Sequence, residues 1–187
     1  MSEIRKIAVT GPPCSGKSTV LRDFVETFDG HAVVAEEQAR ILLEGVPVEE
    51  RSTIEQQYRL VAAIEVEEER AARRGLPVLC DRSVLDGVAY LRNAGRREEA
   101  EALFDHIRFW LPTYERFVVC SPEGIPYEQD GVRTEPPEFR DSLYRHLIET
   151  FNDYGIEFDL LTGSREERHE RIVAIVREGR AYPDTVS

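Results

Sequence analysis

Short apolar runs alternate along the chain with longer amphipathic segments. The apolar runs are rich in Val, Ile and Leu and end at turn or charged residues, which is typical of strands that are buried on both faces of a sheet. The amphipathic segments repeat apolar side chains at helical spacing, as Val20, Leu21, Phe24 and Phe28 do, and this indicates helices packed on a core. We predict strands at residues 4–10, 31–36, 76–81, 115–121 and 156–163.

At least one helical segment follows every predicted strand, and glycines close several of these segments, as is common at helix C-termini. Because strands and helices alternate in this way, we predict one doubly wound α/β domain over residues 1–187, with a five-stranded parallel sheet and helices on both faces. The predicted helices cover residues 17–28, 36–45, 54–74, 83–95, 98–110, 138–155 and 165–179.

The net charge and the lengths of the apolar runs argue against nucleic-acid and membrane partners. The chain of 187 residues has 36 acidic and 24 basic side chains, a net charge of −12, which repels polyanions and argues against a broad nucleic-acid surface. No apolar run approaches the roughly 20 residues of a membrane span, and the first residues are too few and too acidic for a secretory signal. We therefore expect a cytoplasmic protein with no membrane partner. Its cysteines are expected to be reduced thiols: Cys14, Cys80 and Cys120.

The chain has only two lysines, Lys6 and Lys17, and the second lies in the pattern Gly11-x-x-x-x-Gly16-Lys17-Ser18. This is the phosphate-binding (Walker A) pattern, and it stands where the pattern requires, between a predicted strand and a predicted helix. Glycines let successive amide N–H groups turn toward a phosphate, and the helix N-terminus adds its positive dipole end. The predicted nucleotide-binding residues are Gly11, Pro12, Pro13, Cys14, Ser15, Gly16, Lys17, Ser18 and Thr19.

The pattern assigns separate roles within this loop. Lys17 is predicted to contact the β- and γ-phosphates as a catalytic residue, and the Ser18 hydroxyl is predicted to bind Mg²⁺. A glycine-rich turn with an incidental lysine is the alternative, and the flanking strand and helix argue against it. The nucleotide is ATP or GTP. No Asn-Lys-x-Asp segment that would select guanine occurs in the sequence.

Two further strands end in charged residues. Because ligands of parallel sheets collect at the carboxyl ends of the strands, Asp81 after the third strand is a candidate metal ligand or proton acceptor, and Arg82 is a candidate for binding an anionic group of a substrate. The alternative is that Asp81 or Ser83 caps the next helix. Asp86 either faces the same cleft or is a solvated acid of a first helical turn.

Glu37 and Arg40 follow the second predicted strand, three residues apart on a predicted helix. A surface ion pair explains them, and so does an acceptor site in which Glu37 is a general base or binds a substrate hydroxyl. Both interpretations stay open at this point.

Residues 122–138 lack periodicity and are dense in Pro, Gly and charge. Long irregular segments in compact domains are usually functional, and we predict a lid loop over about residues 122–138. Arg133 is its candidate catalytic residue, placed to offset charge on a transferring phosphoryl group. Arg140 opens a helix and is a weaker candidate. Arg165 and Arg168, after the fifth strand, could border the adenine end of the site, but we do not assign them to it.

Four segments carry a resemblance to a known family: the Walker A loop, "EEQAR", "DRSVLDGVAYL" and "PYEQDGVR", in this order. Over roughly residues 4–178 the chain resembles small AAA-type ATP-binding proteins and the nicotinamide riboside kinase domains of bacteria. "DRS" is also similar to a segment of deoxynucleoside and thymidylate kinases. The resemblance implies that Asp81 and Arg82 bind metal or acceptor, that Arg133 is a lid arginine and that Glu37 lies at the acceptor. No arginine finger or hexamer-forming small domain accompanies these segments.

The sequence therefore predicts a P-loop phosphotransferase. It would move the γ-phosphoryl group of ATP·Mg²⁺ to a small nucleoside-like or nucleotide-like acceptor, bound by Glu37, Arg40 and Arg82. A nucleotide-dependent regulatory switch that acts through a protein partner is the alternative. A nucleic-acid 5′-kinase is disfavoured by the acidic composition. The identity of the acceptor and the oligomeric state are left open.

Overall fold

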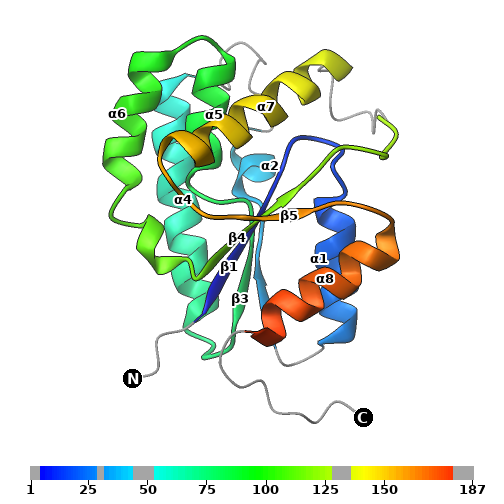
Figure 1. Ribbon diagram of the computed structural model, residues 1–187. Coiled ribbons are helices and arrows are strands. Elements are labelled where there is room, and N and C mark those ends of the chain that lie inside the picture. The colour runs from blue at the N-terminus through cyan, green and yellow to red at the C-terminus, as the bar shows by residue number, and fades with distance from the viewer. Residues whose placement is uncertain (1–4, 29–31, 44–52, 128–135, 179–187) are drawn as a thin grey trace.

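The computed structural model describes residues 5–28, 32–43, 53–127 and 136–178. Five parallel strands form one sheet in the order β2-β3-β1-β4-β5, with helices on both faces (Figure 1). The predicted doubly wound α/β architecture is thereby confirmed. The strands are β1 (Lys6–Thr10), β2 (Val33–Ala35), β3 (Val78–Asp81), β4 (Arg116–Cys120) and β5 (Asp159–Leu161).

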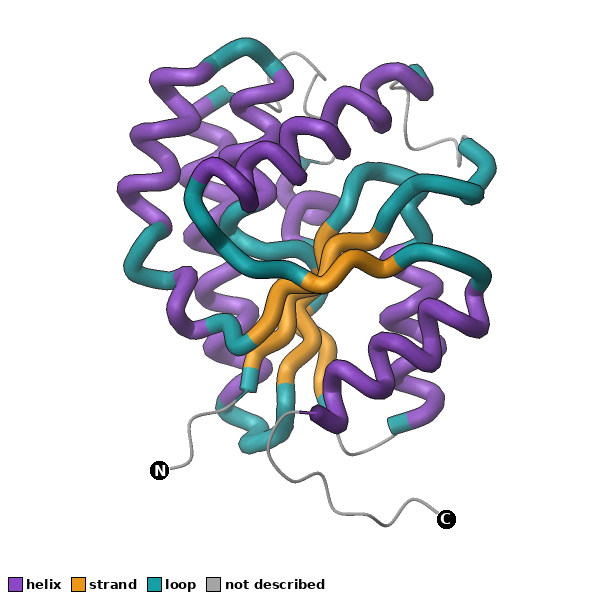
Figure 2. The backbone as a smooth tube through the Cα atoms, viewed as in Figure 1, coloured by secondary structure: helices purple, strands orange, loops and turns teal. Residues whose placement is uncertain are grey.

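Strand β1 lies at the centre of the sheet between β3 and β4. Val9 pairs with Asp81 on one side and with Val118 on the other, so the ends of these three strands are nearly level. Because all pairs are parallel, the loops that follow the strands leave from one edge of the sheet. Figure 2 shows these loops in teal, above the orange strands.

The helices divide between the two faces of the sheet. Helices α1 and α8 lie together on one side, and α4, α5, α6 and α7 lie on the other (Figure 1). A short 3₁₀ helix, η1, precedes β4. The bounds are α1 (Lys17–Thr27), α2 (Gln38–Leu42), α4 (Ile54–Ala72), α5 (Asp86–Asn93), α6 (Arg97–Ile107), η1 (Leu111–Thr113), α7 (Pro137–Asp153) and α8 (Arg165–Glu178).

Alternation along β1 explains why both faces are covered. Ile7 and Val9 pack with apolar side chains of α1 and α8, whereas Ala8 between them packs with those of α4 to α7. All three residues are fully buried. A strand with apolar side chains on both faces is stable only when helices exclude water from each side.

Several predicted boundaries differ from those in the structure. The predicted helix 83–95 begins only at Asp86, because residues 83–85 form a turn in which the Asp86 carboxylate accepts hydrogen bonds from the backbone N–H and the hydroxyl of Ser83. The predicted helix 98–110 ends at Ile107, since Pro112 cannot continue a helix and starts η1 instead. The fifth strand is shorter than residues 156–163, and the predicted helix 36–45 is described only as α2, Gln38–Leu42.

None of the helices in the described ranges combines the length and the apolar character that a membrane crossing requires.

Candidate functional site

The loop between β1 and α1 has a backbone that few sequences permit. Gly11, Cys14 and Gly16 have φ angles of 146°, 52° and 83°. Residues other than glycine rarely adopt such positive values. A Cβ atom on Gly11 would lie 2.7 Å from the carbonyl oxygen of Cys120, so no side chain fits there. The spacing of the two glycines in the sequence therefore reflects a steric requirement of this turn.

Lys17 is buried at the start of α1, with 5% of its surface exposed. Its Nζ donates to the carbonyl oxygens of Gly11, at 2.9 Å, and Pro12, at 2.8 Å, and thus bridges the loop that precedes it. Burial, reinforced by the nearby Arg82 charge, lowers the pKa of Lys17 from 10.5 to about 8. A poorly solvated cation of this kind is stabilised by any anion that reaches it.

The rest of the loop leaves the first turn of α1 accessible. Gly16 is the N-cap of α1 and contributes no side-chain cap, so the free N–H groups of that turn have no side-chain acceptor at the cap position. Ser18 is exposed in the first turn, and Thr19 beside it is half-buried. This arrangement has the features of a helix N-terminus that binds a phosphate.

Asp81 ends β3, beside Val9 of β1. Its Oδ1 atom is buried and accepts no hydrogen bond from any described residue. Burial raises the pKa of Asp81, and the negative charge of Glu37 raises it further, while Lys17 and Arg82 oppose the shift. Asp81 does not cap the next helix, whose N-cap is Leu85; the Ser83 hydroxyl, the other candidate, accepts a hydrogen bond from the Leu85 N–H at 3.2 Å.

Arg82 connects the ends of β1, β2 and β3. Its guanidinium is buried and donates from Nε to Glu37 Oε1 at 2.6 Å, and from Nη1 to Asp86 Oδ1 at 3.1 Å and to the Gly11 carbonyl oxygen at 3.3 Å. Glu37, 45 residues away along the chain, is thus an internal partner of Arg82. The ion pair orients the Glu37 carboxylate at the site.

Asp86 has a role that its sequence context left undecided. It is not a solvated first-turn acid, because only 4% of its surface is exposed. Besides Arg82, it accepts hydrogen bonds from Thr10 Oγ1 at 2.6 Å and from both N and Oγ of Ser83 at 2.9 Å. This one carboxylate therefore joins the end of β1 to the turn that carries Arg82.

Arg168, in the first turns of α8, also reaches the site, although the sequence analysis did not assign it. It is 3% exposed and donates from Nη1 to the carbonyl oxygen of Ser15, within the phosphate loop, at 2.9 Å. A signal was available, because Arg168 lies one helical turn before Ile172 and shares its buried face. A charged residue on an apolar helix face indicates a specific partner.

Other candidates lie elsewhere. Arg133 is outside the described residues, and of Arg40 only its place in α2 is described. Arg140 donates to the carbonyl oxygen of Ile125 at 3.0 Å and holds the start of the predicted lid loop. Arg165 forms an ion pair with Asp23 of α1 on the surface. Trp110 packs against the core.

The site combines cations for a phosphate chain with carboxylates for a metal or a proton. The charges of Glu37 and Arg82 contribute to the pKa shifts of both Lys17 and Asp81, and these two groups also act on each other. Within the described ranges no three His, Cys, Asp or Glu side chains form a cluster able to hold a metal by themselves. This pattern suits Mg²⁺ better than a tightly caged ion, because Mg²⁺ usually has one or two carboxylates, with water and phosphate oxygens completing its shell.

Comparisons with known proteins bear on the family and the fold. The model of a family described as "AAA domain" matches residues 6–168. No curated protein sequence matches the chain significantly.

Two solved structures of NadR protein, one with NAD and AMP-PNP and one with NR, superpose with TM-scores of 0.73 and 0.74 at 18% and 17% identity. They cover 99% of this chain, which spans only about half of theirs, 52% and 53%. Deoxyadenosine kinase from M. mycoides, with products dCMP and dCDP, superposes with a TM-score of 0.59 at 15% identity, over 92% of this chain and 99% of its own. The chain therefore belongs to the AAA domain family and has the P-loop fold of these kinase-like structures.

Proposed function

We propose that the protein is a phosphotransferase that binds ATP or GTP with Mg²⁺ and transfers the γ-phosphoryl group to a small nucleoside-like or nucleotide-like acceptor. One observation supports the proposal most directly. Lys17, Asp81 and the Arg82–Glu37 ion pair lie near one another beside the phosphate loop. A nucleotide-binding loop alone needs no buried carboxylates, whereas phosphoryl transfer uses them to bind a metal and to orient an acceptor.

The residues fit Mg²⁺. Asp81 Oδ1 is a buried carboxylate oxygen to which no described group donates a hydrogen bond, and the Ser18 hydroxyl lies exposed in the first turn of α1. These two side chains would hold the ion, directly or through water. When bound, Mg²⁺ supplies charge neutralisation at the β- and γ-phosphates.

The proposed transfer forms one bond and breaks another. The acceptor hydroxyl oxygen bonds to the γ-phosphorus while the bond from that phosphorus to the β–γ bridging oxygen breaks, and the hydroxyl proton passes to a carboxylate. Asp81 and Glu37 are the candidate bases. Lys17, whose folded environment disfavours its own charge, offsets the charge on the phosphates. Arg133 of the lid loop remains the proposed second cation.

A label-transfer assay tests the proposal. The protein is incubated with γ-labelled ATP or GTP, Mg²⁺ and a panel of nucleosides, nucleotides and riboside cofactors, and transferred label is measured. We expect transfer to at least one nucleoside-like compound, and loss of both transfer and ATP binding in Lys17→Met with the thermal melt retained. Hydrolysis without transfer to any acceptor would favour the regulatory switch instead.

Two variants distinguish the roles of the Asp81 and Glu37 carboxylates. Asp81→Asn is expected to raise the Mg²⁺ concentration that gives half-maximal activity. Glu37→Gln is expected to lower kcat while leaving this Mg²⁺ dependence unchanged, if Glu37 is the base. The reverse pair of results would assign the proton to Asp81.

A further inference from the structure

Arg168 lies where three loops meet. Apart from the bond to Ser15 in the phosphate loop, its guanidinium donates to carbonyl oxygens of Ser121 at 2.9 Å and Glu123 at 3.4 Å, after β4, and of Gly163 at 2.9 Å, after β5. Strands β1, β4 and β5 are neighbours in the sheet. The Arg168 side chain thus holds together the loops that follow three adjacent strands. These loops lie to the right of the sheet in Figure 2.

The contact with Ser15 sets the direction of a peptide unit. A trans peptide bond points its C=O and the following N–H in opposite directions. Because Arg168 binds the Ser15 carbonyl oxygen from the side of α8, the N–H of Gly16 points away from α8. Outward carbonyls and inward amides are what a phosphate-binding loop requires. Arg168 therefore stabilises the loop conformation that binds phosphate.

Arg168 has no carboxylate partner among the residues that the structure describes. Within the part of the chain that the structure describes, every acceptor of this buried guanidinium is a backbone carbonyl, and no Asp or Glu oxygen lies within the 4.0 Å of an ion pair. Glu167 is nearby, but its carboxylate accepts from the backbone N–H of Ser164. The position near the N-terminus of α8 also opposes a positive charge.

Burying a cation under these conditions is unfavourable unless something else offsets it. A polyphosphate on the adjacent loop would do so. Both Lys17 and Arg168 are close enough to Cys120 for their charges to lower the pKa of its thiol, against the burial that raises it to about 11. The two cations thus both lie near the end of β4, beside the phosphate loop.

We infer that Arg168 is a positioning residue for nucleotide binding, which fixes the phosphate loop to the loops after β4 and β5 and adds an unneutralised positive charge behind it. The inference rests on the proposed function, because it concerns the site that binds the triphosphate. Arg168 touches the backbone of the site and acts on the phosphates through it.

The test compares Arg168→Gln and Arg168→Lys with a control on the same helix. Arg171→Gln removes an exposed arginine that pairs with Asp159 and Glu178 and does not reach the site. Dissociation constants for ATP, ADP and inorganic tripolyphosphate are measured by calorimetry well below each variant's melting temperature. KM for ATP and for the acceptor is measured separately.

Arg168→Gln is expected to weaken ATP, ADP and tripolyphosphate binding by about tenfold or more, because charge-assisted hydrogen bonds and a formal charge are lost. The acceptor KM is expected to stay unchanged. Arg168→Lys, which retains the charge, is expected to recover part of the tripolyphosphate affinity. Arg171→Gln is expected to bind all three within about twofold of wild type.

Unchanged ATP and tripolyphosphate affinity in Arg168→Gln, with a lowered melting temperature, would make Arg168 a structural tie and overturn the inference. If the glutamine variant does not fold, the same comparison is made on Arg168→Lys, where full wild-type affinity for ATP would overturn it. Failure of the proposed function has a different signature in the wild-type protein, which would then either bind neither ATP nor tripolyphosphate, or bind ATP and transfer label to no acceptor.

Discussion

Lys17 and Arg82 are both held at the site in states that are unfavourable for the isolated residue. Lys17 is a buried ammonium group held by carbonyl oxygens. Arg82 is a buried guanidinium on a left-handed backbone. In each case the unfavourable local state persists because neighbouring groups fix it, and each leads to a measurable consequence.

The lowered pKa of Lys17 predicts that ATP binding depends on pH. Below about pH 8 the ammonium is charged and binds phosphate, whereas above that value it loses its proton. Affinity for ATP is therefore expected to fall about tenfold between pH 7 and pH 9, measured by calorimetry. Lys17→Met should bind weakly at every pH, and Cys14→Ser should keep the wild-type slope, which excludes the thiol in the loop.

The lowered pKa of Lys17 also predicts how the free energy of unfolding changes with pH. Between about pH 8 and the ordinary value of 10.5, the unfolded chain holds a proton that folded Lys17 has released. Lys17 therefore destabilises the folded protein below about pH 8, and the free energy of unfolding rises as the pH increases through this window. A wild-type protein with the same pH slope of stability as Lys17→Met would contradict the assignment.

The φ of 79° at Arg82 predicts an unusual order of stabilities among variants. Arg82→Ala and Arg82→Gly both lose the bonds to Glu37 and Asp86, but only glycine relieves the backbone strain. Arg82→Gly is expected to be more stable than Arg82→Ala by roughly 1 kcal/mol in chemical denaturation. Equal stabilities, or a more stable alanine variant, would mean that the left-handed backbone is not retained.

At the scale of elements, the β1–α1 loop is limited by the packing of β4 beneath it. Gly11 and Gly75 both have positive φ, but a Cβ at Gly75 would meet no atom within 4 Å, whereas one at Gly11 would lie 2.7 Å from the Cys120 carbonyl oxygen. The two positions therefore separate backbone strain from a steric clash with the neighbouring strand.

Gly75→Ala is expected to lower the free energy of unfolding by about 1 kcal/mol and leave ATP affinity unchanged. Gly11→Ala is expected to be more destabilising and to abolish ATP binding, because the loop must move away from β4. Denaturation and calorimetry measure the two effects. Retained ATP affinity in Gly11→Ala would show that the loop tolerates the displacement.

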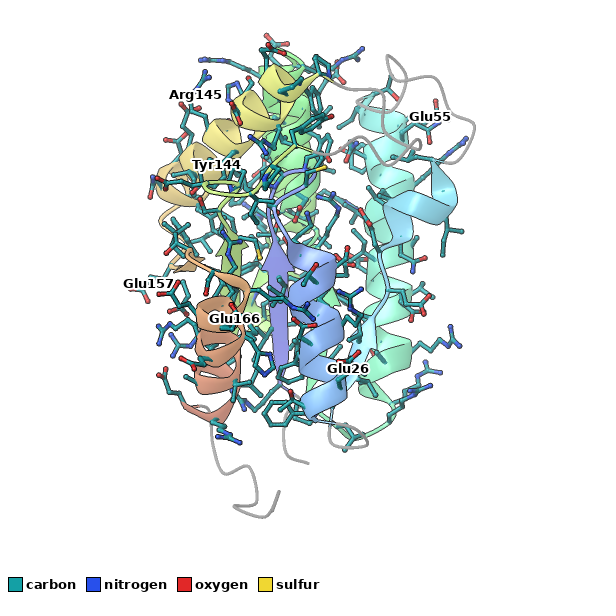
Figure 3. All side chains as sticks on the ribbon, turned by 90° about the vertical axis from the view of Figure 1, so that its right-hand side faces the viewer. Glu26, Glu55, Tyr144, Arg145, Glu157 and Glu166 are labelled. Atoms are coloured by element: carbon teal, nitrogen blue, oxygen red, sulfur yellow. The ribbon has the colours of Figure 1, made fainter. Side chains whose placement is uncertain are left out.

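At the scale of the whole molecule, helices on one face are tied to the amino end of β1, opposite the site. Glu68 of α4, 1% exposed, accepts hydrogen bonds from Lys6 Nζ at 3.0 Å, Trp110 Nε1 at 2.8 Å and Tyr114 OH at 2.5 Å. The opposite face is tied differently, by surface contacts between α1 and α8 such as Arg165–Asp23. Glu26 and Glu166 mark these two helices side by side in Figure 3.

Removing the carboxylate from this network is expected to leave Lys6 buried without its charge partner. Glu68→Ala should therefore lower the free energy of unfolding by about 3–5 kcal/mol, while ATP affinity, measured where the variant is folded, stays within about twofold of wild type. Glu69→Ala, an exposed neighbour on α4, should change stability by no more than about 0.5 kcal/mol. A large loss of ATP affinity in Glu68→Ala would mean that the two ends of β1 are coupled.

The sequence by itself determined the succession of strands and helices along the chain, the fold class and the phosphate loop. Each depends on local rules: apolar runs and helical periodicity report burial along one segment, and Gly11, Gly16 and Lys17 lie within one turn. The boundaries at Asp86 and Ile107 were less predictable, because the hydrogen bonds between Ser83 and the Asp86 carboxylate set the first and Pro112, which cannot continue a helix, set the second.

Only the tertiary structure decided which charged groups meet. Glu37 and Arg82 come together because β2 and β3 are neighbours, Asp86 is buried because it joins that turn to Thr10, and Arg168 reaches Ser15 from 153 residues away. The physical reason is that a charged side chain shows no periodicity of its own. Its burial and its partners follow from the order of strands in the sheet, which no local pattern of residues specifies.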